Sequence, residues 1–325
     1  MSDRSTSSLI TSEVAESPAT AESETPAGLA TTGSPDRPRG LLGDAWYDLR
    51  RNPMFWVSVV LIMLFLTMAA FPSLFTSVDP DYGELSRSRN GPSADAWFGY
   101  DVQGKDVFAR VIHGTRASIT VSILATLGTV LLGGTVGVIT GYLGGWVDAL
   151  LSRVADVLFA LPFVLGAIVI LFTFNAPGEH KSVLTIELMV AATLMVLSWP
   201  LSMRIMRSSV LATKQADYVL AARAMGAGTG RIIFRHLIPN CMAPLLVYAT
   251  ILVGSFIGAE ATLSYLGVGL QSPVVSWGIM IADAKDYLRV SPQLMLFPAA
   301  FLVVAVLSFV MLGEAVREAL DPKLH

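Results

Sequence analysis

The residues of this chain that could do chemistry gather in one polar stretch between two long apolar runs. The stretch spans Asp217–Asn240 and has the sequence DYVLAARAMGAGTGRIIFRHLIPN. It carries Arg223, Arg231 and Arg235, but no grouping of nucleophile, base and acid. Its glycines separate a small-residue helix from a second short basic helix that stops at Pro239, so the spacing predicts two helices joined by a bend. Such an elbow suits the docking of a partner protein rather than catalysis.

A second segment, Gly99–Asp106, looks like a nucleotide site. Its sequence, GYDVQGKD, matches the phosphate-binding pattern G-x-x-x-x-G-K-[ST] at every position except the last. Asp106 stands where the pattern needs a hydroxyl for Mg²⁺, and it adds negative charge beside the phosphates. No buried strand precedes the segment. We therefore expect no nucleotide site here and no ATP hydrolysis by this chain alone.

Glu260 is an isolated carboxyl near the outer end of an apolar run. An ionisable group in hydrocarbon costs about 2.5 to 3.5 kcal/mol on insertion scales, so we expect it to face a cavity, a partner or the membrane interface. A functional place of this kind and a structural hydrogen bond near the interface are both open. The four histidines lack ligand spacing, and the single cysteine, Cys241, excludes an intramolecular disulfide. No metal or other cofactor is expected on this chain.

The elements that position these residues are long apolar runs. Of the 325 residues, 53% are hydrophobic and 14% charged, which is more apolar surface than one soluble core needs. A spanning helix needs roughly 20 apolar residues to cross about 30 Å of hydrocarbon. Six runs qualify, at about 55–75, 118–141, 152–174, 188–206, 243–266 and 294–312. Because they do not alternate, the sequence predicts an all-α polytopic membrane protein with six transmembrane helices.

Small and helix-breaking residues predict how these runs pack. Glycines recur every fourth residue in the second and fifth runs: Gly133, Gly137, Gly141, Gly254 and Gly258. This spacing lets helix backbones approach closely, either within the chain or at a dimer seam. Pro162 and Pro200 are expected to kink the third and fourth runs. Arg153 and Asp156 are expected to pair on a helix surface, and Cys241 to act as a small packing residue.

The distribution of charge predicts the topology. Between the fourth and fifth runs the only acid is Asp217, whereas six cations lie there: Arg204, Arg207, Lys214, Arg223, Arg231 and Arg235. Loops rich in Lys and Arg stay in the cytoplasm, so this loop should be cytoplasmic. With six spans both termini are cytoplasmic too, an N-in/C-in topology. Residues 1–40 are rich in Ser, Thr, Pro, Ala and Glu, which predicts a disordered cytoplasmic tail.

The polar stretch resembles the cytoplasmic EAA loop of ABC importer permeases. The pattern of that loop is E-A-A, three residues, Gly, nine residues and I-x-L-P. The matching residues are Ala221, Ala222, Gly226, Ile238 and Pro239. Leu220 replaces the Glu and His236 replaces the Ile, and both departures look like the dipeptide/oligopeptide branch of the family.

Other stretches resemble the same branch. WFGYDVQGKDVFARVIHGTRAS at 97–118 looks like FGTDxxGRDVxSRxxxGxRxS, and GYLGGWVD at 141–148 looks like GYxGGxxD. Residues 260–278 are similar to ExxLSFLGxGxxxPxxSWG, and ALDPKL near the C-terminus is similar to the LDPR ending. The resemblance runs from about residue 50 to the C-terminus and points to the C-type permease subunit of a dipeptide/oligopeptide (Opp/Dpp) importer.

The resemblance implies a type I ABC importer permease fold. Residues 41–116 would hold the first span and an external loop, 117–313 the permease core with a cytoplasmic coupling loop at 207–240, and 314–325 a cytoplasmic C-terminus. The implied partners are a homologous B-type permease, two cytoplasmic ABC ATPases, an external substrate-binding protein, a peptide substrate and the lipid of a bacterial cytoplasmic membrane. No nucleic acid is implied, and ATP hydrolysis would belong to the separate ATPases.

The resemblance also implies which residues couple the chain to an ATPase. They are Asp217, Tyr218, Ala221, Ala222, Arg223, Gly226, Arg231, Arg235 and Pro239. Ala221, Ala222 and Gly226 would form a small face that allows close approach, while the arginines would make rim contacts. Glu260 would line or border the translocation path.

Two alternatives stay open. The same architecture could import nickel, haem or a glycan, because sister permeases share every motif quoted above. An ion-driven secondary transporter would instead need paired ionisable groups or broken helices near the membrane midplane, and repeats in its two halves. The sequence offers only Glu260 and no convincing repeat.

Overall fold

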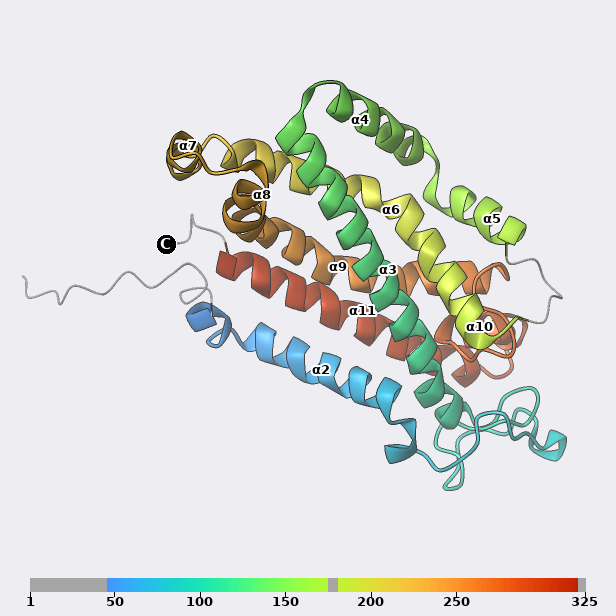
Figure 1. Cartoon of the computed structure of the whole chain (residues 1–325). Coiled ribbons are helices and arrows are strands. Elements are labelled where there is room, and N and C mark those ends of the chain that lie inside the picture. Colours follow the sequence, from blue (N-terminus) through green and yellow to red (C-terminus); the bar gives the residue numbers. More distant parts are fainter. Residues whose placement is uncertain (1–45, 175–180, 321–325) are drawn as a thin grey trace, which may run out of the picture. The chain divides into compact units, whose positions relative to one another are not determined.

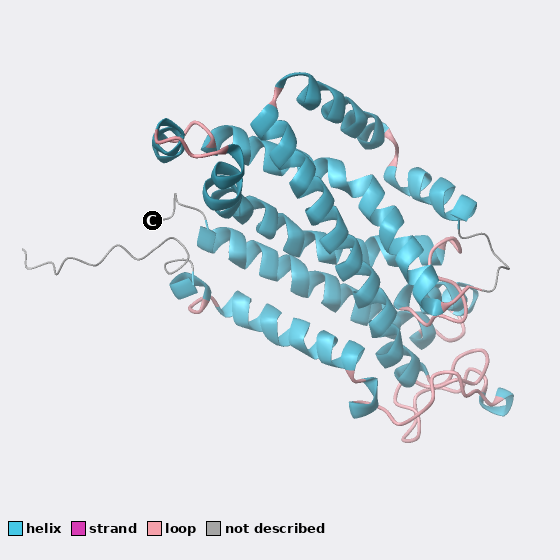
Figure 2. Cartoon of the chain, in the orientation of Figure 1, coloured by secondary structure: helices cyan, strands magenta, loops and turns pink. Residues whose placement is uncertain are grey.

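The computed structural model describes residues 46–174 and 181–320. They belong to one compact unit that begins at Gly40. Within the described ranges the chain forms helices, loops and two isolated β-bridges, without a strand (Figure 2). The all-α prediction is therefore confirmed. The predicted disordered tail at 1–40 lies outside the described residues.

Five helices in the described part are long and apolar enough to cross a membrane. They are α2 (Pro53–Ala70), α3 (Val107–Leu143), α6 (Val183–Thr213), α9 (Ile238–Tyr265) and α11 (Gln293–Leu320). In Figure 1 the start of α2, the end of α11 and the polar stretch between α6 and α9 lie at one end of the bundle. We call this the elbow end. The opposite end, with the segments 71–106 and 266–292, is the loop end.

The third predicted span is divided into two helices. α4 (Gly145–Ala160) and α5 (Phe163–Phe174) meet at 92°, and together they can count as a sixth span. The break falls at Leu161, whose backbone is extended, and Pro162. Proline disfavours helical backbone at the residue before it and lacks an N–H of its own. The expected kink at Pro162 is thus a complete break, whereas α6 continues through Pro200.

Polar side chains fix where several helices begin. Asn52 accepts a first-turn N–H of α2 at 2.9 Å, and the carboxylate of Asp106 accepts one of α3 at 2.9 Å. Ser276 accepts one of the short helix α10 (Trp277–Ala284) at 3.3 Å. First-turn N–H groups have no partner inside a helix, so such caps stabilise the start. α3 consequently begins at Val107, ahead of its apolar run.

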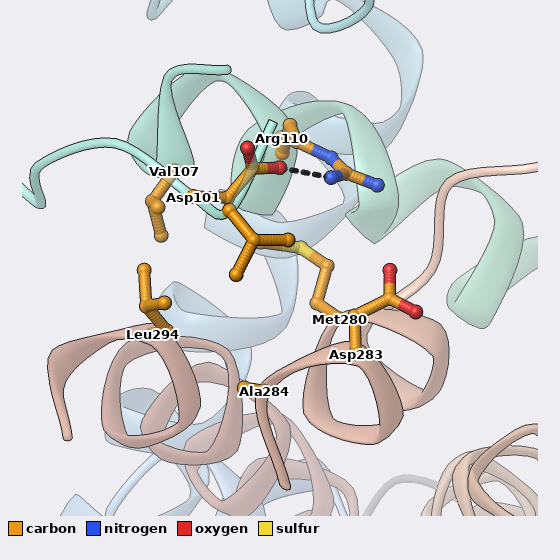
Figure 3. Close-up of a pocket in the computed structure, with 8 residues that line it drawn as sticks. Asp101, Val107, Arg110, Met280, Asp283, Ala284 and Leu294 are labelled. Atoms are coloured by element: carbon orange, nitrogen blue, oxygen red, sulfur yellow. Dashed lines mark hydrogen bonds and ion pairs between the residues drawn. The ribbon is translucent and has the colours of Figure 1, made fainter. Parts of the chain in front are cut away.

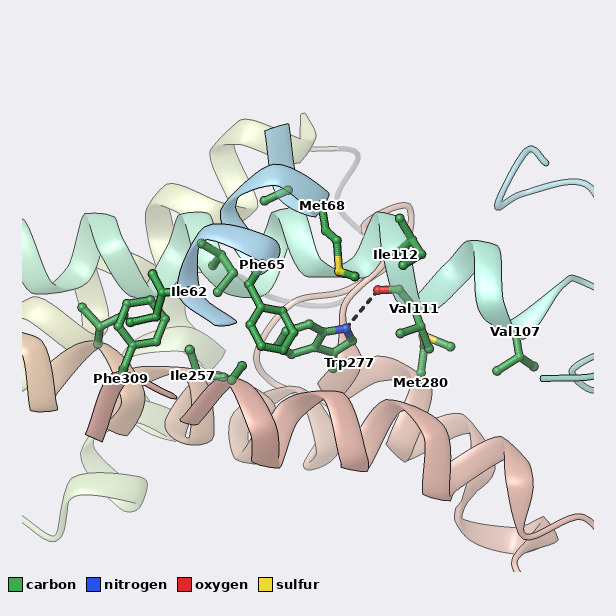
Figure 4. Packing of buried hydrophobic residues seen from close by; sticks show 14 of the residues in the cluster. Ile62, Phe65, Met68, Val107, Val111, Ile112, Ile257, Trp277, Met280 and Phe309 are labelled. Carbon is green, nitrogen blue, oxygen red and sulfur yellow. Dashed lines mark hydrogen bonds between the residues drawn. The ribbon is translucent and has the colours of Figure 1, made fainter. Parts of the chain in front are cut away.

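Trp277 joins three helices at the loop end. Its side chain has no exposed surface, and its indole N–H donates to the carbonyl of Val111 in α3 at 3.0 Å. The ring of Phe65 in α2 packs edge-on at 5.7 Å between centroids (Figure 4). A buried Trp needs a partner for its N–H, and the α3 carbonyl provides it. α10 is thereby fixed to α2 and α3.

Glycines bring α3 and α6 into close contact. A Cβ on Gly133 would lie 2.6 Å from the carbonyl oxygen of Trp199, and one on Gly137 would lie 2.6 Å from that of Met203. Only a residue without a side chain allows helix backbones to approach this closely. The expected packing role is therefore confirmed within the chain for these glycines.

We expect Gly137→Ala to destabilise the protein by about 1 to 3 kcal/mol, because the added methyl group would overlap backbone that cannot move alone. Gly258→Ala is the matched control, since a Cβ there would meet nothing within 4 Å. Thermal unfolding in detergent measures both. Equal stability of the two variants would contradict the close packing of α3 on α6.

Candidate functional site

The polar stretch Asp217–Asn240, called the elbow from here on, folds as two short helices. α7 (Asp217–Ala224) is followed by a turn and by α8 (Thr229–Ile232). α8 continues through a π-helical segment (Ile233–Leu237) into α9. The predicted pair of helices with a bend is confirmed. The predicted stop at Pro239 is wrong, because Pro239 lies in the first turn of α9, where a missing N–H is tolerated, and the helix continues. The second helix begins at Thr229, before the expected Arg231.

Gly226 makes the turn of the elbow. Its φ of +82° lies in the left-handed region, which favours glycine. The N–H groups of Gly226 and Ala227 donate to the carbonyls of Arg223 and Ala222, each at 3.0 Å. These two bonds are the Schellman arrangement that ends a helix. A local backbone motif therefore explains why glycine occupies this position.

One face of α7 packs against the rest of the chain. Val219 has no exposed surface and belongs to the same buried cluster as Ile232 and Leu237. Ala222 lies one turn further along this face and is only 5% exposed. The expectation that Ala222 shares an open face with Ala221 and Gly226 is therefore wrong, because the chain itself covers its methyl group. Ala221 and Gly226 are exposed as expected.

The outward face of the elbow is cationic. Arg223, Arg231 and Arg235 are all exposed. No carboxylate in the described part of the chain forms an ion pair with any of them. Beside α7 opens a cavity of about 270 Å³, lined by Tyr142, Lys214, Gln215, Leu220 and Arg223. Its lining contains two cations and no acid, so it suits an acidic group.

Large apolar side chains also project from the elbow. Met225 is 83% exposed, Phe234 74% and Leu220 47%. The sequence does not single these residues out, although each is apolar within an otherwise polar stretch. Apolar groups surrounded by cations on an open surface are typical of a protein interface.

The remaining predicted residues of the elbow lie at helix ends. Asp217 is in the first turn of α7, where the helix dipole favours negative charge. Tyr218 is partly exposed, and the centroid of its ring lies 6.4 Å from that of His236. Partial burial raises the pKa of the Tyr218 hydroxyl. Pro239 is exposed in the first turn of α9. Apart from Ala222, the predicted coupling residues of the elbow are thus all exposed.

Two ion pairs hold α4 against α6 near the elbow. Arg207 donates to both oxygens of Asp148, at 2.7 and 2.6 Å, and Arg204 donates to Asp156 at 2.8 Å. The expected pair of Arg153 with Asp156 is wrong, because α6 presents a cation directly to Asp156. Pairs within one helix contribute only about 0.2 to 0.5 kcal/mol and yield readily to such a partner.

Glu260 lies in α9 without any exposed surface. Its carboxylate accepts hydrogen bonds from Ser118 of α3 at 2.9 Å, Ser264 of α9 at 2.8 Å and Ser276 of the α10 cap at 3.1 Å. These contacts support the structural alternative. A place beside a translocation path stays a prediction.

Comparison with known proteins decides the family. The family described as "Binding-protein-dependent transport system inner membrane component" matches residues 133–325, and "N-terminal TM domain of oligopeptide transport permease C" matches residues 40–92. The chain belongs to this family of permeases. It is a multi-pass membrane subunit of an ABC transporter and not an enzyme, since ATP hydrolysis in this family belongs to separate subunits.

Named relatives match the permease over most of its length. "Dipeptide transport system permease protein DppC" of Alkalihalophilus pseudofirmus is 36% identical over 86% of this chain and 90% of the relative. "Oligopeptide transport system permease protein OppC" of Bacillus subtilis is 38% identical over 87% and 90%. "Glutathione transport system permease protein GsiD" of Pectobacterium atrosepticum is 32% identical over 86% and 90%.

One solved structure, described as "Crystal structure of an amino acid ABC transporter with histidines", aligns with a TM-score of 0.47 and 15% identity. It covers 63% of this chain and 91% of that chain. This likeness is too weak to establish a shared fold by itself.

The nucleotide-like segment of the permease forms a turn at the loop end. The Asp101 carboxylate accepts the N–H groups of Gln103 and Lys105, at 2.8 and 2.9 Å, and also pairs with the buried Arg110 of α3. Figure 3 shows the carboxyl of Asp283, from α10, across a small cavity from the Arg110 guanidinium. Restricted hydration raises the pKa of Asp283, although Arg110 opposes the shift.

We expect the stability of the permease to depend on protonation of Asp283. A carboxyl with a raised folded-state pKa stabilises the fold at pH values below its unfolded pKa of about 3.9, and this contribution is lost as the pH rises through the folded value. Asp283→Asn should therefore flatten the decline in melting temperature between about pH 4 and pH 8. Asp95→Asn, at an exposed carboxyl of the loop end, is the matched control. A steeper decline in Asp283→Asn would contradict the assignment.

Proposed function

We propose that the permease is the membrane subunit of an ATP-driven importer of di- and oligopeptides in a bacterial cytoplasmic membrane. The cargo is supported by the similarity to relatives named for dipeptides, oligopeptides and glutathione. The elbow end is the cytoplasmic side, in keeping with its excess of cations. A homologous permease completes the translocation path, because six helices alone rarely enclose a lumen of peptide size.

The observation that carries the coupling proposal is the open surface of the elbow. Met225, Phe234 and Leu220 expose apolar groups in the same stretch as three exposed arginines that form no ion pair within the described part of the chain. A soluble partner that covered this surface would bury the apolar groups and could pair the arginines with its own acids. The family resemblance of the elbow implies that this partner is a cytoplasmic ABC ATPase.

Movement of a docked elbow would reach the spans through continuous helices. α8 runs into α9 without a break, and α6 ends just before α7. The glycine contacts tie α3 to α6, and the pair of Arg207 with Asp148 ties α4 to α6. Closure of two ATPases would therefore tilt α6 and α9 together with their neighbours, and so convert an inward-facing cavity to an outward-facing one. An external binding protein would deliver the peptide at the loop end.

A different cargo on the same architecture is the second candidate. The relative named for glutathione is nearly as similar as those named for dipeptides and oligopeptides, so closely similar chains carry different names for their cargo. Nickel, haem and glycans therefore stay open. The ion-driven alternative is disfavoured by membership of a binding-protein-dependent family, despite the break between α4 and α5.

We expect Met225→Asp to abolish docking of the ATPase while insertion and thermal stability stay unchanged. The side chain is 83% exposed, so the substitution disturbs no internal contact, whereas a charge in the apolar centre of an interface costs about 2 kcal/mol or more. Co-purification of ATPase with tagged permease and uptake of labelled peptide measure the effect.

Leu85→Asp is the matched control, because Leu85 is an equally apolar side chain, 76% exposed, at the loop end. It should leave ATPase co-purification at the parental level. Normal ATPase recovery and uptake in Met225→Asp would show that the exposed elbow surface is not the coupling site.

A further inference from the structure

We propose that Glu260 is a positioning residue, which seats the loop-end segment 266–284 on α3 and α9 and thereby sets how readily the permease responds to its external binding protein. The second half of this inference rests on the proposed function; the first does not. We call Glu260, Ser118, Ser264 and Ser276 the Glu260 cluster.

The cluster converges on one acceptor. Three serine hydroxyls donate to the Glu260 carboxylate at 2.8 to 3.1 Å, and they come from α3, from α9 and from the residue that caps α10. Ser118 is 142 residues away from Glu260 in the chain. One side chain therefore joins three elements that local sequence does not hold together.

Two of the three serines also accept backbone N–H groups. Ser264 Oγ accepts the N–H of Leu270 at 3.0 Å, and Ser276 Oγ accepts that of Ile279 at 3.3 Å. A hydroxyl can accept through its lone pairs and still has one proton to donate, so each of these two serines bonds to a backbone N–H and to Glu260 at once. The loop after α9 and the start of α10 are both connected to the carboxylate in this way.

Around the cluster, two glycines of the segment lie in close contact with the backbone of α9. A Cβ on Gly269 would lie 2.5 Å from the N atom of Ser264, and one on Gly278 would lie 2.6 Å from Cα of Ala261. The segment therefore lies directly on α9. A network that is buried and fully hydrogen-bonded favours one arrangement of its elements, because any other arrangement leaves polar groups unpaired.

The complete burial of Glu260 favours a positioning role over direct contact with cargo. Its side chain has no exposed surface, so it touches neither solvent nor a transported molecule in this arrangement. Phe65 and Val111 still hold Trp277 when Glu260 is changed, and this keeps α10 attached to the bundle. Loss of the carboxylate should therefore loosen the loop between α9 and α10 rather than unfold the bundle.

Cysteine labelling of the purified permease tests whether Glu260 holds the segment 266–284 on α3 and α9. The native Cys241 is 1% exposed, and Val274→Cys introduces a reporter at a position within the segment that is 5% exposed and packs in a buried cluster with residues of α3 and α9. In the Val274→Cys background we expect Glu260→Ala to raise the rate of maleimide labelling by about tenfold or more, since three hydroxyls lose their acceptor. Glu260→Gln should stay near the parental rate, because its amide oxygen still accepts and its nitrogen can donate to a serine.

Two further variants test one serine of the cluster and one serine outside it. Ser276→Ala removes one bond to Glu260 together with the cap bond to Ile279, and it should raise labelling by less than Glu260→Ala because Ser118 and Ser264 keep their acceptor. Ser122→Ala is the matched control, because its hydroxyl donates to the backbone carbonyl of Ser118 at 2.7 Å and lies outside the cluster. Labelling of Glu260→Ala or Ser276→Ala at the rate of Ser122→Ala would overturn the seating role, whatever the cargo proves to be.

The second half of the proposal, the response to the binding protein, is tested in the reconstituted complex with its ATPases and binding protein. We expect Glu260→Ala to raise the binding-protein concentration for half-maximal stimulation of ATP hydrolysis by about tenfold, with the maximal rate retained and with rescue by Glu260→Gln. Faster labelling together with an unchanged half-maximal concentration would overturn this half alone. A parental complex that ignores its binding protein would refute the proposed function, and the labelling result would stand independently.

Discussion

Hydrocarbon offers no hydrogen bonds, and the rest of this structure depends on that constraint. Each span must satisfy its backbone groups internally, which leaves the helix as the available element. Several hydroxyls inside the spans are satisfied by donating to carbonyls of their own helix. Thr115 bonds to Val111 at 3.0 Å and Thr193 bonds to Met189 at 2.8 Å. The carboxylate of Glu260, which has no exposed surface, is satisfied instead by the hydroxyls of three serines.

The same constraint places the charged groups at the two ends of the bundle, and the two ends use them differently. At the loop end, Asp101 and Arg110 form an internal ion pair, and Asp106 caps α3. At the elbow end, Arg204 and Arg207 pair with acids of α4, but the arginines of the elbow itself do not pair within the described chain. These charges of the loop end are thus paired or capping within the chain, whereas the charges of the elbow stay available to another molecule.

Rigid connections link these ends. α3 packs on α6 through glycines that admit no side chain, and α9 carries both the elbow, through α8, and the Glu260 cluster, through its far end. A displacement at the elbow and a displacement of the segment 266–284 therefore act on the same helix. A helix transmits such motion because its backbone bonds resist local deformation, while packed interfaces tend to move between discrete arrangements.

The sequence by itself determined the features that depend on near neighbours. Apolar runs gave the positions of the spans, Pro162 gave the break between α4 and α5, and the glycines after α7 gave the bend of the elbow. These properties follow from transfer of side chains into lipid and from backbone preferences that act over a few residues. Only the tertiary structure decided the 92° angle of that break, the inward orientation of Ala222, the pairing of Asp156 with Arg204 and the convergence of three serines on Glu260. Such partners are chosen by the rotation and proximity of whole helices, which hydropathy and residue spacing along one chain do not encode.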